Sequence, residues 1–126
     1  MDASFESPKQ GCNAFAHRTR ILDLVHLSRM TLGDRNVEAE VLALFLRQSE
    51  TMTVRASNAL GLELAALAHT LKGSAQAIGA WRVADCAERL ETIAGTNPDD
   101  VPSALAELLA AVKEANMAIA RILQSA

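Results

Sequence analysis

Apolar side chains recur every three or four residues along most of this chain, which is the spacing that places them on one side of an α-helix. The clearest of these stripes predicts a helix over about 62–78 and consists of Leu64, Leu67, Leu71, Ala75 and Ile78. Gly79 interrupts the pattern, so we expect this helix to end there.

Similar stripes predict four further helices. The first covers about 18–31, and its apolar side consists of Ile21, Leu24, Val25 and Leu27. The second covers about 35–58, with Val41, Leu44, Phe45 and Met52. The fourth covers about 80–95, with Val83, Cys86, Ala87, Leu90 and Ile93. The last covers about 100–124, with Val101, Leu105, Leu108, Val112, Ala115, Ile119 and Ile122.

Polar and helix-breaking residues separate these segments. Gly33 and Asp34 predict a turn and a helix cap, and residues 98–102 predict a loop. Four long amphipathic helices with short connections indicate an all-α protein, an antiparallel up-down four-helix bundle whose short additional N-terminal helix caps one end. Residues 1–16 lack a sustained period and are expected to form a flexible N-terminal arm, with 17–126 forming the bundle domain.

Composition supports this fold and narrows the function. Half of the 126 residues are hydrophobic but only 3% are aromatic, so Ala and Leu, both strong helix formers, must fill the core. A net charge of -3 argues against a nucleic-acid binder. No apolar run reaches the roughly 18 residues that span a bilayer, and no signal-peptide pattern opens the sequence. We therefore expect a cytoplasmic protein that does not bind membranes. The two cysteines lack the spacing of metal ligands.

The histidine of the 62–78 helix is predicted to face solvent. His69 lies two residues from both Leu67 and Leu71, and each helical residue advances by about 100°. The imidazole is therefore turned roughly 200° away from the apolar stripe. The expected orientation leaves the ring outside the core.

Small residues surround His69 on the predicted helix surface. The positions three and four residues away are Ala65, Ala66, Lys72 and Gly73. A solvated helix usually carries Glu, Lys and Arg at such positions, and Gly costs about 1 kcal/mol of helix stability relative to Ala. A bare patch of this kind suits a site that another protein's backbone must approach closely.

Phosphoryl chemistry fits this setting. Histidine titrates near neutral pH, so a large share of it is neutral and nucleophilic in the cytoplasm. An imidazole nitrogen is able to hold a phosphoryl group as a phosphoramidate, and Lys72 is placed to offset charge on the phosphoryl oxygens. The same residues also fit an ordinary solvated helix surface, and the pattern alone leaves both interpretations open.

The stretch His69-Thr70-Leu71-Lys72-Gly73-Ser74, followed by Ile78-Gly79-Ala80, resembles the signature of the histidine-containing phosphotransfer (HPt) domain family. The resemblance continues through Cys86-Ala87-Glu88-Arg89-Leu90-Glu91 and, upstream, through Leu42-Ala43-Leu44-Phe45-Leu46. It covers about residues 20–124 and includes the order of the helices. It implies a phosphocarrier of multistep two-component phosphorelays.

The resemblance assigns a role to each site residue. His69 would be the phosphoacceptor, through Nε2, and Lys72 would stabilise the phosphoryl group. Gly73 would leave room for the phosphoryl group and the incoming receiver. Glu91 matches a family position that orients the imidazole, although a solvated surface carboxylate is nearly as good an interpretation. Ala65, Ala66 and Gln76 would form the docking surface.

The resemblance also implies the partners. They would be the receiver domains of a hybrid histidine kinase and of a response regulator, with Mg²⁺ on the receiver and no intrinsic cofactor. Glycine-rich ATP-binding boxes are absent from the sequence, so an intermediate carrier is expected rather than an ATP-dependent enzyme. The chain is expected to be a monomer, and the alternatives are a non-phosphorylated helical adaptor that binds receiver or kinase domains and a dimeric phosphotransferase.

Three other side chains remain open at this point. His17 lies beside the predicted arm, and His26 is expected on a polar or partly packed face. Trp81 begins the fourth predicted helix and is expected either to pack or to serve as an exposed docking contact.

Overall fold

The computed structural model describes residues 21–125, so the expected arm over 1–16 and His17 lie outside the described part of the chain. Within that part the chain is helical throughout, with short connections and no strand. The elements are α1 (Leu24–Met30), α2 (Arg35–Ser57), α3 (Gly61–Ile78), α4 (Trp81–Thr96), the 3-10 helix η4 (Pro98–Asp100) and α5 (Val101–Gln124).

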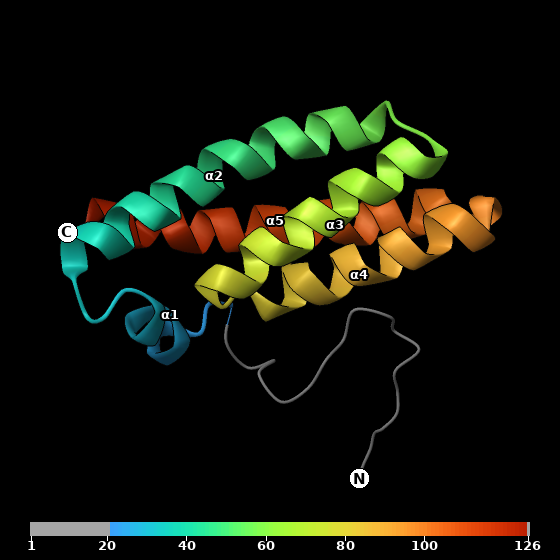
Figure 1. Cartoon of the computed structure of the whole chain (residues 1–126). Coiled ribbons are helices and arrows are strands. Elements are labelled where there is room, and N and C mark those ends of the chain that lie inside the picture. The colour runs from blue at the N-terminus through green and yellow to red at the C-terminus, as the bar shows by residue number, and fades with distance from the viewer. Residues whose placement is uncertain (1–20, 126) are drawn as a thin grey trace, which may run out of the picture.

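The four long helices form an up-down bundle. Consecutive helices α2, α3, α4 and α5 run in opposite directions, joined by short connections at alternating ends (Figure 1). Each packs against its neighbour in sequence, and α2 also packs against α5, which closes the bundle. The predicted all-α four-helix bundle is therefore confirmed, and α1 lies at one end of it, against α3.

The core is built largely from aliphatic side chains and alanine. All five residues of the stripe predicted for α3 are buried, and each is 8% exposed or less. Among the described helices, α3 and α4 form the most extensive contact. Small buried residues line these two helices: Ala68, Ala75, Ala84 and Ala87. Because alanine lets helix axes approach closely, α3 and α4 lie near enough for their outer side chains to touch.

Two of the predicted stripes are partly wrong. Helix α1 begins only after Asp23, whose Oδ1 accepts a hydrogen bond from the backbone N–H of His26 at 3.0 Å, and it is seven residues long. The side chains predicted to form its apolar side are mostly exposed, and only Leu27 is buried: Ile21 37%, Leu24 48%, Val25 61% and Leu27 2%. In α2, Leu44 is 45% exposed and Leu42 is buried instead, because the helix presents a different phase of its apolar run to the core.

Two boundaries also differ from the prediction. Gly95 lies inside α4, which continues to Thr96. The expected loop over 98–102 is the single turn η4 followed directly by the first turn of α5, which contains Pro102. The cap at Asp34 is confirmed, because its Oδ1 accepts from two backbone N–H groups of α2.

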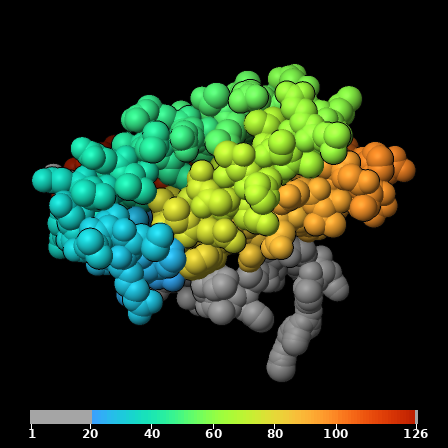
Figure 2. Space-filling view, viewed as in Figure 1, coloured from blue at the N-terminus to red at the C-terminus, as the bar shows by residue number. Residues whose placement is uncertain are grey.

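A polar clamp fastens α1 to the end of α3. The backbone N–H of Asp23 donates to the carbonyl of Gly79 at 2.9 Å, and Trp81 Nε1 donates to Asp23 Oδ2 at 3.0 Å. His26 Nε2 donates to the Gln76 carbonyl at 2.8 Å, and its ring packs on Trp81 with centroids 4.9 Å apart. Trp81 is therefore a packing residue, His26 is partly packed, and α1 covers the end of α3 (Figure 2).

We expect Gly79→Ala to destabilise the protein. Gly79 has φ +79°, and a Cβ there would lie 2.8 Å from the carbonyl oxygen of Asp23. The left-handed conformation alone costs an L residue roughly 1–2 kcal/mol, and the collision adds to it. Urea unfolding should show that the free energy of unfolding falls by about 2 kcal/mol or more.

Gly95→Ala is the matched control for this change. Gly95 lies in α4, and an added Cβ would meet nothing within 4 Å. The same substitution should raise the free energy of unfolding by about 0.5–1 kcal/mol at Gly95. Equal effects at the two glycines would contradict the assigned role of Gly79.

Candidate functional site

Helix α3 presents His69 to solvent. Leu67 and Leu71, two residues to either side, are buried at 8% and 2% exposure, whereas the His69 side chain is 65% exposed. The orientation predicted from helical phase is therefore confirmed. Because α3 is packed along its whole opposite face, the imidazole stands on a fixed part of the bundle.

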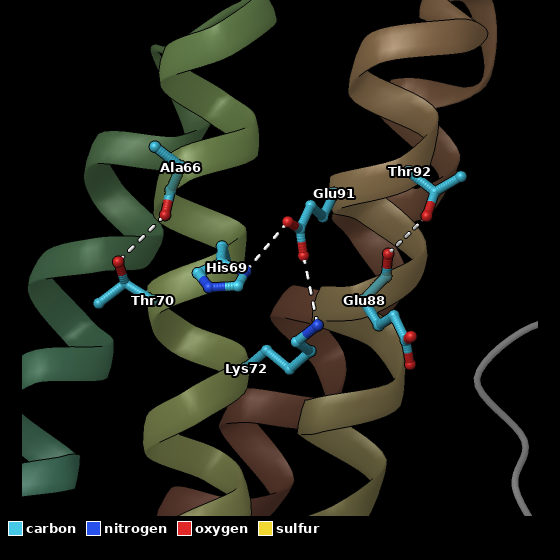
Figure 3. A network of polar contacts seen from close by, with 7 residues as sticks. All are labelled: Ala66, His69, Thr70, Lys72, Glu88, Glu91 and Thr92. Atoms are coloured by element: carbon cyan, nitrogen blue, oxygen red, sulfur yellow. Dashed lines mark hydrogen bonds and ion pairs between the residues drawn. The ribbon is translucent and has the colours of Figure 1, made fainter.

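A single carboxylate joins His69 to Lys72. Glu91 on α4 places Oε2 3.0 Å from His69 Nδ1 and Oε1 3.6 Å from Lys72 Nζ (Figure 3). A carboxylate only accepts hydrogen bonds, so the contact assigns the ring proton to Nδ1. The lone pair of a neutral His69 then lies on Nε2, the nitrogen directed away from this contact.

These three residues meet because of helix spacing and close packing. Lys72 lies one turn after His69 on α3, and Glu91 follows the fully buried Leu90 on α4. The side chains of Lys72 and Glu91 are 22% and 31% exposed. Partly exposed ion pairs contribute at most about 1 kcal/mol to stability, so the contact serves mainly to orient the groups.

Neighbouring hydroxyl groups bind within their own helices. Thr70 Oγ1 donates to the Ala66 carbonyl at 3.1 Å, and Thr92 Oγ1 donates to the Glu88 carbonyl at 3.2 Å (Figure 3). Neither hydroxyl is directed at the imidazole by these bonds. Among the described residues, the side chain bonded to His69 is that of Glu91, and Lys72 is joined to the ring through this carboxylate.

The predicted bare patch is present, with one correction. Ala66, Gly73 and Gln76 are exposed on α3, but Ala65 is half-buried and packs against the core, so it adds less surface than expected. A Cβ added at Gly73 would meet nothing within 4 Å. Internal packing therefore does not require glycine at this position, in contrast to Gly79.

One contact in the site was not predicted from the sequence. Glu91 was expected to reach His69, but its second bond, to Lys72, depends on how α3 and α4 are aligned. Two features of the sequence were available: Lys72 follows His69 by three residues, and Glu91 is the acidic residue matched to the imidazole. Only the register between the helices shows that one carboxylate serves both.

The described residues contain neither a metal-binding cluster nor a membrane-spanning segment. Over residues 21–125, His, Cys, Asp and Glu do not gather in a group of three or more suited to a metal ion. In the same part of the chain, each helix is too short or too polar to cross a membrane.

Fold and site together define a helical bundle that exposes one oriented imidazole, that of His69, to solvent. The family model of the Hpt domain matches residues 40–118, which is well over half of the chain. The protein belongs to the Hpt domain family, whose members take part in histidine phosphotransfer in phosphorelays and interact with receiver domains of two-component systems. Neither the curated proteins nor the solved structures include a match to this chain.

Proposed function

We propose that His69 accepts a phosphoryl group from the aspartyl phosphate of a hybrid kinase's receiver domain and passes it to the receiver of a response regulator. The observation that carries this proposal is the bond from His69 Nδ1 to Glu91, which leaves Nε2 as the exposed nucleophile. A histidine on a solvated surface without a fixed partner would have no such orientation.

The transfer is a balanced exchange of bonds. The Nε2 lone pair of His69 attacks phosphorus, the bond from phosphorus to the aspartyl oxygen breaks, and its electron pair returns to the receiver's carboxylate. Lys72 offsets charge on the phosphoryl oxygens, and Mg²⁺ held by the receiver supplies the rest of the charge stabilisation. The protein itself acts as a carrier, without an intrinsic cofactor.

The surface around His69 supports docking of a receiver domain. Ala66 and Gly73 leave the helix surface low on either side of the imidazole, and Gln76 offers a polar contact two turns along. A partner's backbone is therefore able to approach within reach of Nε2. We propose that the carrier works as a monomer, since α2 closes against α5 and completes one core.

His69→Gln should abolish phosphorylation. Incubation of the wild type with a phosphorylated receiver domain should give acid-labile phosphate on the protein, because phosphohistidine is cleaved by acid whereas phosphoserine survives. His26→Gln is the matched control: His26 also lies on a helix, but its Nε2 is occupied by the Gln76 carbonyl, so labelling should persist.

Two outcomes would contradict the proposal. A wild-type protein that takes no label from any receiver of the same cell argues against a carrier. A receiver that binds wild type and His69→Ala with equal affinity, and leaves no phosphate on either, indicates the adaptor function instead.

Gly73→Ala should separate stability from transfer. The residue is helical with open space beside it, so alanine should raise the free energy of unfolding by about 0.5–1 kcal/mol. The new methyl group stands one turn from His69, in the space that the phosphoryl group and receiver need, so the transfer rate should fall. Gly95→Ala, which should give the same stabilisation, is the control, and equal transfer rates for both variants would show that Gly73 has no special role.

Ala66→Glu should weaken receiver docking. Ala66 is exposed one turn before His69, and a carboxylate there adds bulk and a negative charge facing the acidic phosphorylation site of a receiver. We expect the half-saturating receiver concentration to rise about tenfold, which corresponds to roughly 1.4 kcal/mol. Ala106→Glu, at an exposed alanine of α5, should leave it unchanged, and a similar loss at both positions would reject the docking surface.

A further inference from the structure

Cys86 is a buried residue of α4 that has a covalent partner. Its side chain belongs to the apolar side of the helix and is 0% exposed, which is also the ordinary setting of a cysteine that only fills a core. The sulfur of Cys86 is disulfide-bonded, however, and the described residues contain no free cysteine. Because the sequence contains two cysteines, the partner that the chain itself offers is Cys12.

The anchoring of Asp23 brings the preceding chain close to Cys86. Asp23 Oδ2 accepts a hydrogen bond from Trp81 Nε1 at 3.0 Å, which fixes this part of the chain at the start of α4. Cys86 follows Trp81 by five residues, or about 7.5 Å along the helix axis. Cys12 precedes Asp23 by eleven residues, and a chain of that length reaches up to about 36 Å when it is extended. A bond between the two sulfurs therefore requires no rearrangement of the bundle.

The surface beside Cys86 also offers a charge to the preceding chain. Asp85 is half-buried, and its Oδ2 is buried. The stretch between Cys12 and Asp23 carries Arg18 and Arg20. A carboxylate oxygen that is removed from water is stabilised by a cation. Charge complementarity thus favours the same position for the N-terminal segment, residues 1–20, as the disulfide does.

We propose that Cys12 and Cys86 form a reversible redox site, whose disulfide fastens the N-terminal segment to α4 and whose reduction releases it. The oxidant is a small-molecule disulfide such as oxidised glutathione. One protein thiolate attacks a sulfur of this molecule and expels one thiolate, and the second protein thiolate attacks the mixed disulfide and expels the other. The two protein thiols lose two electrons and two protons, which convert the small disulfide into two thiols. Reduction is the reverse of these steps.

The proposed redox site is separate from the site at His69. Glu91 follows Cys86 by five residues, and five helical steps of about 100° turn the two side chains roughly 140° apart. Glu91 is directed at His69 on α3, so Cys86 lies on another side of α4. The inference therefore goes beyond the proposed phosphotransfer and does not depend on it.

Intact mass spectrometry of the full chain tests the bond. After equilibration with oxidised glutathione, the wild type should be a monomer that is lighter by two hydrogen atoms than the reduced protein. An excess of reduced glutathione should restore the two thiols without unfolding the protein. Cys12→Ser should not lose the two hydrogen atoms. Cys86→Ala, which keeps a small apolar side chain in the core, should behave in the same way.

Trypsin digestion tests whether the bond fastens the N-terminal segment. Cleavage after Arg18 or Arg20 separates Cys12 from the bundle. In the oxidised wild type, the piece that contains Cys12 should stay attached until a reductant is added, whereas in Cys12→Ser it should leave at once. Cleavage itself should be about tenfold slower in the oxidised than in the reduced protein, because a fastened segment opens less often.

Several outcomes would overturn the inference. Two thiols that persist in oxidised glutathione, a disulfide-linked dimer, or separate glutathione adducts on both cysteines would exclude the intrachain bond. A bond that survives an excess of reduced glutathione, or equal cleavage rates in the two states, would exclude reversible fastening. Phosphorylation of His69 is a separate measurement: a chain that takes no label but forms the bond keeps the redox site and loses the proposed relay function.

Discussion

The close packing of α3 against α4 is the constraint on which the candidate site depends. Ala75 and Ala87 are completely buried, and Ala68 and Ala84 are 2% and 4% exposed. A larger side chain at any of these positions would overpack the contact and push the helices apart. Such a shift would lengthen the 3.0 Å bond between His69 and Glu91 beyond the usual N–H···O range of about 2.7–3.2 Å. The alanines buried between α3 and α4 thus help to set the distance between His69 and Glu91 at the surface.

The C-terminal end of α3 is held by its glycine cap and by polar contacts with α1. Gly79 turns the chain in a left-handed conformation, and its carbonyl binds the backbone of Asp23. Asp23 and His26 then hold α1 against Trp81 and the last turn of α3. A helix tied along one face and at its end has little freedom to rotate, so the direction of the imidazole is set by the scaffold rather than by its own rotamer alone.

Much of the fold was predictable because apolar spacing is a local property. The α3 stripe was correct at every position, since its neighbours are small or polar and only one helical phase buries the leucines. The α2 phase was ambiguous because Leu42, Leu44, Phe45 and Leu46 lie in one nearly continuous apolar run, and packing against α3 and α5 selects among them. The α1 boundary was missed although Asp23 is an ordinary capping residue, and its further contacts with Gly79 and Trp81 join residues that are far apart in the sequence.

The candidate site likewise has features that local spacing predicts and features that depend on how the helices pack. The outward direction of His69 follows from its distance of two residues from Leu67 and Leu71, and helical phase alone places Lys72 and Gly73 beside it. Glu91 lies 22 residues after His69, on another helix, so its place beside the ring depends on how α3 and α4 are aligned. Sequence spacing alone does not predict this alignment, and only the family resemblance placed Glu91 beside the imidazole. The contact between Lys72 and Glu91 is harder still to predict from the sequence, because it also depends on the rotamers of both side chains.

The residues around His69 contribute less to the stability of the fold than this helix surface could, which supports the docking role that we propose for it. Gly73 lies inside α3 where alanine would fit, so the protein gives up helix stability at a position that packing leaves free. Ala66 adds no ion pair to a solvated face. By contrast, Arg82 and Arg89 on α4 both reach glutamates of α5, so the bundle does use interhelical ion pairs elsewhere. Charge is concentrated on Lys72 and Glu91 and is absent from the exposed Ala66, Gly73 and Gln76, as the docking of a receiver domain that we propose at His69 would require.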